Sequence, residues 1–181
     1  METKLTMYSR KSPETFHAQK VEETKIQTIV EAGNYAPVFG AVHFTVIENA
    51  ELISSIKDTT LNMMKHSGNE FLEKQASDPS YDPICNAPTI IVLSALNGND
   101  EQGFNMANVG CAAQNMMLMS TELGVSSRYV MAPVMAFANI DIVKQIHIPN
   151  RYVPLAMVLV GYSDVNVKKR DIQKDNIAYV K

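Results

Sequence analysis

The sequence predicts a single folded domain in which strands and helices alternate and the central strands of a sheet are buried. Two almost uninterrupted apolar runs, at residues 89–95 and 155–160, are typical of strands in the interior of a sheet. A third segment, residues 105–123, predicts a helix that is apolar almost all the way round. Because such a helix must be covered on every side, we expect it to be central and shared with a second subunit. A methionine-rich core helix that binds no ligand has the same pattern.

The other elements follow from hydrophobic spacing and from turn residues. Helical spacing predicts an amphipathic helix at residues 21–34, further helices at residues 50–65 and 136–146, and a short helix at residues 70–75. β-Branched and aromatic residues predict strands at residues 43–47 and 126–130.

Three segments carry no such periodicity. The loop at residues 35–41 is punctuated by Pro and Gly but is apolar, so it should line something. Disorder is expected only at the two ends of the chain. The last segment, residues 163–181, is too isolated to pack alone, so we expect it to extend a sheet or to reach a partner.

Composition excludes several functional classes. The 181 residues carry a net charge of −3, so there is no basic field that would attract nucleic acid. No apolar run approaches the length of a membrane span, and the N-terminus lacks the apolar core of a signal peptide, so we expect a cytoplasmic protein. Cys85 and Cys111 are not in a CxxC spacing and are expected to be packed thiols rather than a disulfide or a nucleophile.

The common catalytic motifs are missing from the sequence. It contains no GxGxxG before a helix, no phosphate-binding GxxxxGK[ST] and no GxSxG. The four histidines have no i, i+4 partner and no cysteine or carboxylate at ligand spacing, so we expect no metal centre. In a chain without these motifs, a bound organic cofactor can carry the chemistry.

Four separated segments together resemble one family. Residues 10–16, RKSPETF, are similar to an Arg-x-Ser-x-[Arg/Lys]-x-[Phe/Tyr] element, and residues 32–47 contain an Ala-Pro loop followed by a strand. Residues 113–127 are similar to a central helix with a Leu-Gly exit. Residues 148–170 are similar to a penultimate strand with a Gly-Tyr end and a basic tail. In this order and spacing they resemble the nitroreductase family, the homodimeric FMN-dependent oxidoreductases.

The resemblance implies an α+β fold, a mixed or antiparallel sheet sandwiched by helices. It also implies one domain over residues 1–181, an intertwined homodimer with FMN bound where the subunits meet, and a tail at residues 163–181 that reaches the partner.

The resemblance also assigns cofactor-binding residues. Arg10, Lys11 and Ser12 would meet the phosphate or ribityl end of FMN, together with Lys168 and Arg170. A basic run such as residues 168–170 is also typical of a solvated turn. The loop would line the flavin with Pro37, Val38, Phe39 and Gly40, and Met131 or Ala132 would offer a backbone N–H to flavin N5.

The implied activity is ping-pong hydride transfer from NAD(P)H through flavin N5 to a small acceptor such as a nitroaromatic or a quinone. No side chain would act as a catalytic residue. Glu14 stands where the family often has a basic residue that contacts the flavin, and Val38 and Ala41 stand where it commonly has Ser and Asn. These departures leave open a flavin-binding protein without turnover. A flavin-consuming or dehalogenating relative is a further alternative on the same scaffold.

Overall fold

The computed structural model describes residues 2–97, 102–164 and 176–180. The elements follow one another as α1 (Thr3–Ser9), α2 (Glu23–Asn34), β1 (Val42–Ile47), α3 (Ala50–Lys65), α4 (Glu70–Ala76), β2 (Thr89–Leu96), α5 (Gln102–Glu122), β3 (Ser126–Val130), the 3₁₀ helix η1 (Ala132–Ala138), α6 (Ile140–Val143) and β4 (Tyr152–Gly161). Within these ranges, no helix is long and apolar enough to cross a membrane.

The four strands form one antiparallel sheet in the order β1-β2-β4-β3. The two apolar runs predicted to be interior are β2 and β4, and they pair with each other along their length, for example Ile91 with Val158. Their side chains are buried on both faces, which explains the absence of alternation. The short strands β1 and β3 form the two edges, so the α+β fold with an antiparallel sheet is confirmed.

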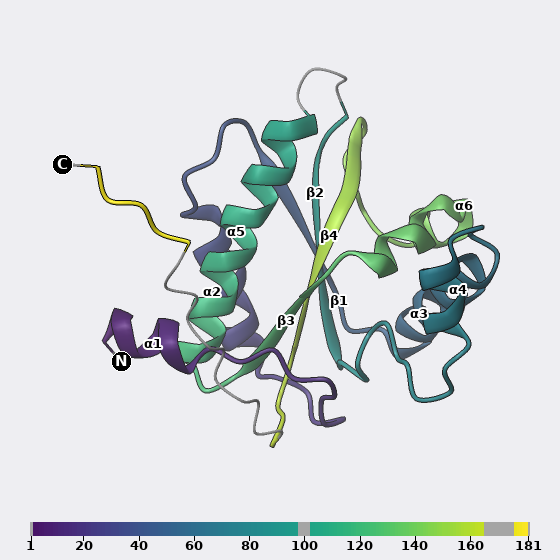
Figure 1. The fold of residues 1–181 in the computed structure, drawn as a ribbon, viewed down its shortest axis with the longest axis horizontal. Coiled ribbons are helices and arrows are strands. Elements are labelled where there is room, and N and C mark those ends of the chain that lie inside the picture. Colours follow the sequence, from purple (N-terminus) through teal and green to yellow (C-terminus); the bar gives the residue numbers. More distant parts are fainter. Residues whose placement is uncertain (1, 98–101, 165–175, 181) are drawn as a thin grey trace.

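Helices cover both faces of the sheet. In Figure 1, α2 and α5 lie on one side of the strands, and α3, α4 and α6 lie on the other. The alternating side chains of β2 divide the interior into two cores, because Ile91 and Leu93 pack with α2 and α5 whereas Ile90 and Val92 pack with α3 and η1.

Helix α5 is only partly covered by its own chain. Its inner side, including Val109, Ala112 and Met116, is buried against α2 and the sheet. On the outer side Phe104 is 63% exposed, and Cys111 is also exposed. The prediction that this helix is central is confirmed, but within the described residues an apolar side of it remains uncovered.

Two segments differ from the sequence-based predictions. The single helix predicted at residues 136–146 is two short helices, η1 and α6, because the side chain of Asn139 accepts a hydrogen bond from the backbone N–H of Asp141 (3.0 Å) and starts a new helix. The N-terminal end, expected to be disordered, contains α1. Buried Thr6 holds this helix on α5 by donating to a carboxylate oxygen of Glu122 (2.9 Å).

Substituting Gly161 at the end of β4 should destabilise the fold. A Cβ at this position would lie 2.9 Å from Phe16 Cδ1 and 2.9 Å from Pro88 Cδ. We expect Gly161→Ala to lower the free energy of unfolding in urea by about 1–3 kcal/mol. Gly103→Ala is the control, because a Cβ there meets nothing within 4 Å. An unchanged unfolding midpoint for Gly161→Ala would show that the contact is not tight.

Candidate functional site

The N-terminal segment is fixed across the open end of the sheet by the burial of Phe16. This side chain is 4% exposed and packs against Gly161. The Phe16 N–H donates to the carbonyl oxygen of Cys85 (2.9 Å), and the His17 N–H donates to the carbonyl oxygen of Tyr162 (2.8 Å). Residues 10–14, which precede this anchor, are therefore held beside the ends of β3 and β4.

Arg10 and Ser12 are brought together just before this anchor. The Arg10 guanidinium Nη1 donates to Ser12 Oγ (2.8 Å), and both residues are partly buried. Within the part of the chain that the structure describes, Arg10 forms no ion pair with a carboxylate. Lys11 beside them is exposed. Arg10 and Ser12, two of the five residues predicted at the phosphate or ribityl end, thus form one preorganised donor group.

Arg128 is a neighbouring residue that sequence reasoning missed. It lies in β3, is partly buried, and donates through Nη1 to the carbonyl oxygen of Pro13 (2.9 Å). Its backbone pairs with Leu159 of β4, whose side chain belongs to the core under α3 and η1. The signal in the sequence was a charged residue in the middle of an otherwise uncharged five-residue strand, SSRYV.

A tight turn at residues 82–86 borders the same region. The Asp82 carboxylate accepts hydrogen bonds from the backbone N–H groups of Ile84 (2.9 Å) and Asn86 (3.0 Å) and pairs with Lys57 Nζ (3.0 Å). Cys85 and Asn86 both have φ of +55°, a left-handed conformation that these bonds maintain. The carboxylate is therefore directed into its own turn.

Cys85 lies inside this turn and is 6% exposed. Burial raises the pKa of its thiol, while nearby Arg128 lowers it and the carboxylates of Asp82 and Glu14 raise it. The four side chains therefore lie within electrostatic range of one another. A buried, protonated thiol is not a nucleophile at neutral pH.

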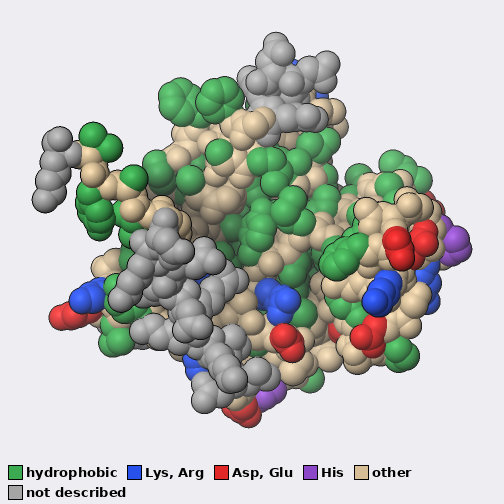
Figure 2. All heavy atoms as spheres, viewed as in Figure 1, with side chains coloured by type: hydrophobic (Ala, Val, Ile, Leu, Met, Phe, Trp, Pro, Cys, Tyr) green, Lys and Arg blue, Asp and Glu red, His purple; other side chains and the backbone are tan. Residues whose placement is uncertain are grey.

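The predicted N5-binding position lies just beyond β3. Met131 follows the last residue of the strand and is 51% exposed, and Ala132 begins η1. On the face shown in Figure 2, hydrophobic side chains gather over the middle of the molecule, and a basic and an acidic side chain lie together below them. An apolar surface with charges at one border suits a flat, amphipathic ligand.

The predicted loop lies at the other edge of the sheet. The Phe39 N–H donates to Asn108 Oδ1 (2.9 Å), and Asn108 Nδ2 donates back to the Phe39 carbonyl oxygen. The Phe39 ring is 85% exposed and lies 6.4 Å from the Phe104 ring, centroid to centroid. This loop leads into edge strand β1, whereas Arg128 and the neighbouring Arg10 lie at the opposite edge strand, β3. Within one chain, the loop residues Pro37, Val38, Phe39 and Gly40 are therefore not brought to Arg10.

Three further expectations concern charged groups and metals. Lys168 and Arg170 lie outside the described residues. Glu14 is exposed and forms no ion pair with any described residue. In the described ranges, no group of three or more His, Cys, Asp or Glu side chains could hold a metal ion.

Known proteins with this architecture carry a common family description. Residues 7–162 match the model of the Nitroreductase family. No curated protein sequence matches the chain. Similar structures include a nitroreductase with bound FMN from Bacteroides fragilis NCTC 9343, with 21% identity, a TM-score of 0.87 and coverage of 100% of both chains.

Two other structures resemble the chain over similar lengths. A nitroreductase with bound FMN from Desulfitobacterium hafniense DCB-2 is 23% identical, with a TM-score of 0.88 and coverage of 100% of this chain and 99% of that one. A BluB-like flavoprotein from Clostridium difficile 630 is 19% identical, with a TM-score of 0.79 and coverage of 100% of both chains. The fold is thus shared along the whole length, and because the family model spans well over half of the residues, the chain belongs to the Nitroreductase family.

Proposed function

We propose that the protein is an FMN-dependent oxidoreductase that passes a hydride from NAD(P)H to a small oxidised acceptor. The observation that carries this proposal is the pair of partly buried arginines, Arg10 and Arg128, which the bonds to Ser12 and to the Pro13 carbonyl oxygen bring to one segment, with exposed Met131 just beyond the strand of Arg128. Cations removed from water and left without carboxylate partners are suited to an anionic ligand. FMN has such an anionic end and a flat apolar ring, and it is bound in two of the similar structures.

Each part of the site has a distinct task in this proposal. Arg10, Lys11 and Ser12 hold the phosphate through charge-assisted hydrogen bonds. The backbone at Met131 or Ala132 offers an N–H to N5, and the exposed Met131 side chain lies beside the ring. FMN itself supplies the hydride chemistry when bound, so the chain provides placement and electrostatics. NAD(P)H and the acceptor, a nitroaromatic, a quinone or a similar molecule, would occupy one face in turn.

We also propose a homodimer in which each site is shared. The uncovered side of α5, with Phe104 and Cys111 exposed, is apolar, and a second copy of the chain would cover it. The loop at residues 37–40 is fixed to the same end of α5 through Asn108. In a dimer formed through α5, this loop would reach the site of the partner rather than its own.

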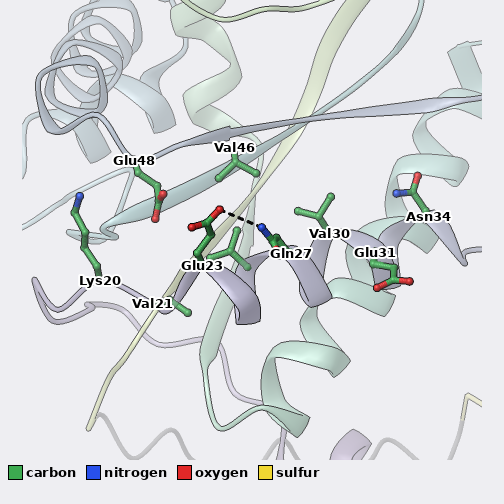
Figure 3. Close-up of a pocket in the computed structure, with 10 residues that line it drawn as sticks. Lys20, Val21, Glu23, Gln27, Val30, Glu31, Asn34, Val46 and Glu48 are labelled. Atoms are coloured by element: carbon green, nitrogen blue, oxygen red, sulfur yellow. Dashed lines mark hydrogen bonds between the residues drawn. The ribbon is translucent and has the colours of Figure 1, made fainter.

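The tail has a suitable partner surface at edge strand β1. A groove of about 650 Å³ runs between β1 and α2. Val46 and Val30 border its middle, and Lys20 and Glu48 lie at one end (Figure 3). Residues 177–180, IAYV, are exposed, with Tyr179 82% and Val180 98% accessible. An apolar extended segment and an open strand edge are complementary, so we propose that the tail of one subunit occupies this groove of the other.

A flavin-binding protein without turnover is the second candidate function. It is favoured by Glu14, an exposed carboxylate two residues from Ser12, which would repel a phosphate or a hydride donor that carries phosphates. Anaerobic addition of NADH or NADPH distinguishes the two candidates. Bleaching of the bound flavin supports the oxidoreductase, and a flavin that stays yellow with both donors supports the second candidate.

The phosphate contacts predict a preference between flavins. We expect the apo-protein to bind FMN much more tightly than riboflavin, and Arg10→Ala to weaken FMN binding by about 1.5–3 kcal/mol, the usual value of a hydrogen bond to a charged group, with little effect on riboflavin. Fluorescence titration measures both, and Lys144→Ala, a substitution of an exposed lysine at the C-terminal end of α6, is the control. Equal affinities for the two flavins would contradict the phosphate assignment.

A shared site predicts complementation between damaged subunits. A chain with Arg10→Ala and a chain with Phe39→Ala should each bind FMN more weakly than the wild type, because each lacks one part of every site. After the two are mixed and refolded, a mixed dimer would contain one intact site, and up to half of the sites in that dimer should bind FMN again. Removing residues after 170 should weaken both dimer formation and FMN retention in sedimentation runs. A stable monomer with bound FMN would exclude the shared site.

The environment of Cys85 predicts that no thiol takes part in turnover. In a Cys111→Ser variant, iodoacetamide should label Cys85 slowly at pH 7–8 and rapidly after unfolding, because burial raises the pKa of the thiol and removes it from solvent. Cys85→Ala and Cys111→Ala should keep NAD(P)H oxidation largely intact. Loss of turnover in either variant with flavin still bound would overturn this expectation.

A further inference from the structure

Arg128 lies between the two proposed ends of the flavin site. Its guanidinium is bonded to the carbonyl oxygen of Pro13, the residue after Ser12, so it lies next to the group that would hold the phosphate. Met131, proposed to contact the ring at N5, is three residues further along the same chain direction. At the usual rise of a strand, this separation is about 10 Å. A ligand that spans from Ser12 to Met131 must therefore pass Arg128.

The guanidinium of Arg128 has donors left for such a ligand. Arginine carries five N–H donors, and the bond to Pro13 uses one. Among the described residues, no carboxylate forms an ion pair with Arg128. The nearest turn offers none either, because Asp82 is engaged by Lys57 and by two backbone N–H groups of its own turn. The charge is partly buried, so an electron-rich partner would stabilise it.

We propose that Arg128 binds the flavin directly, at the N1 and C2 carbonyl edge of its pyrimidine ring, and so stabilises the reduced form relative to the oxidised one. The proposal rests on the proposed function above. Arg10 and Lys11 are assigned to the phosphate and the backbone at Met131 to N5. The ribityl phosphate chain joins the ring at N10, and the N1–C2 edge adjoins N10, so Arg128, bonded next to the phosphate-binding segment, can reach this edge. The reduced flavin carries its negative charge on this edge, so a cation there binds it more strongly.

This role also explains how the chain functions with Glu14. The nitroreductase family often has a basic residue at this position, and here the residue is an exposed carboxylate. Arg128, bonded to the carbonyl oxygen of the residue before Glu14, returns a positive charge to the same part of the site. This positive charge is carried by a residue of strand β3 rather than by a residue of the N-terminal segment.

The test compares the flavin affinities and the reduction potential of three variants with those of the wild type. Arg128→Gln removes the charge, Arg128→Lys keeps it, and Lys144→Gln, at an exposed lysine that ends α6, removes one charge as a control. The measurements are the dissociation constants for FMN and riboflavin and the two-electron potential of bound FMN in an anaerobic dye titration. Circular dichroism and thermal melting show whether each variant is folded.

We expect Arg128→Gln to weaken FMN and riboflavin by similar factors, on the order of tenfold, because both share the pyrimidine edge. We also expect reduced flavin to lose about tenfold more affinity than oxidised flavin, which is a fall of about 30 mV in potential. Arg128→Lys should keep most of the potential, and Lys144→Gln should match the wild type. If Arg128→Gln does not fold, Arg128→Met, which also removes the charge, replaces it: a fall of about 30 mV supports the proposal and a wild-type potential overturns it.

Other outcomes overturn the proposal in distinguishable ways. Weaker FMN with unchanged riboflavin and unchanged potential would mean that Arg128 only positions the phosphate-binding segment through Pro13. Unchanged affinities and potential would mean that it is purely structural. In both cases the wild type still binds FMN, so the proposed function stands. A wild type that binds neither flavin would overturn the proposed function together with this role of Arg128.

Discussion

The packing of Phe16 against Gly161 is the contact on which the candidate site depends. It closes the open end of the two central strands and fixes the chain that precedes it, so Arg10 and Ser12 are positioned by a core contact rather than by a flexible arm. The same end of the sheet carries Arg128, whose bond to Pro13 joins edge strand β3 to that segment. Cations from two distant parts of the sequence therefore converge without any local motif.

A second constraint is the apolar circumference of α5. One domain of this size covers only part of such a helix, and the structure leaves Phe104 and Cys111 exposed. The helix also holds the loop at residues 37–40 through Asn108, at the opposite edge of the sheet from Arg128. A second copy of the chain, as proposed, would cover the helix and would bring the loop to a site. The same dimer contact would therefore contribute to both stability and ligand binding.

Of the two carboxylates beside the site, one is neutralised within its own turn and the other is exposed to water. Asp82 accepts hydrogen bonds from Ile84 and Asn86 and pairs with Lys57, so its charge is used within the turn that supports the site. Glu14 points into solvent, where water screens it. The arginines are the partly buried groups, and the electrostatic interactions of a charge are stronger where water is excluded. The net electrostatic character of the region is therefore set by burial more than by the count of charged residues.

The sequence by itself determined most of the elements, because their signals are local. Interior strands β2 and β4, helix α3 at residues 50–65, and the Leu-Gly exit from α5 follow from periodicity and turn residues over a few positions. Family membership followed from the order of four such segments, and Arg10 and Ser12 followed from that resemblance. Only the tertiary structure revealed the role of Thr6 in holding α1, the division of residues 132–143 into two helices, and the place of Arg128 beside Pro13. These features depend on contacts between residues far apart in the chain or on one capping side chain, and hydrophobic spacing does not encode either of them.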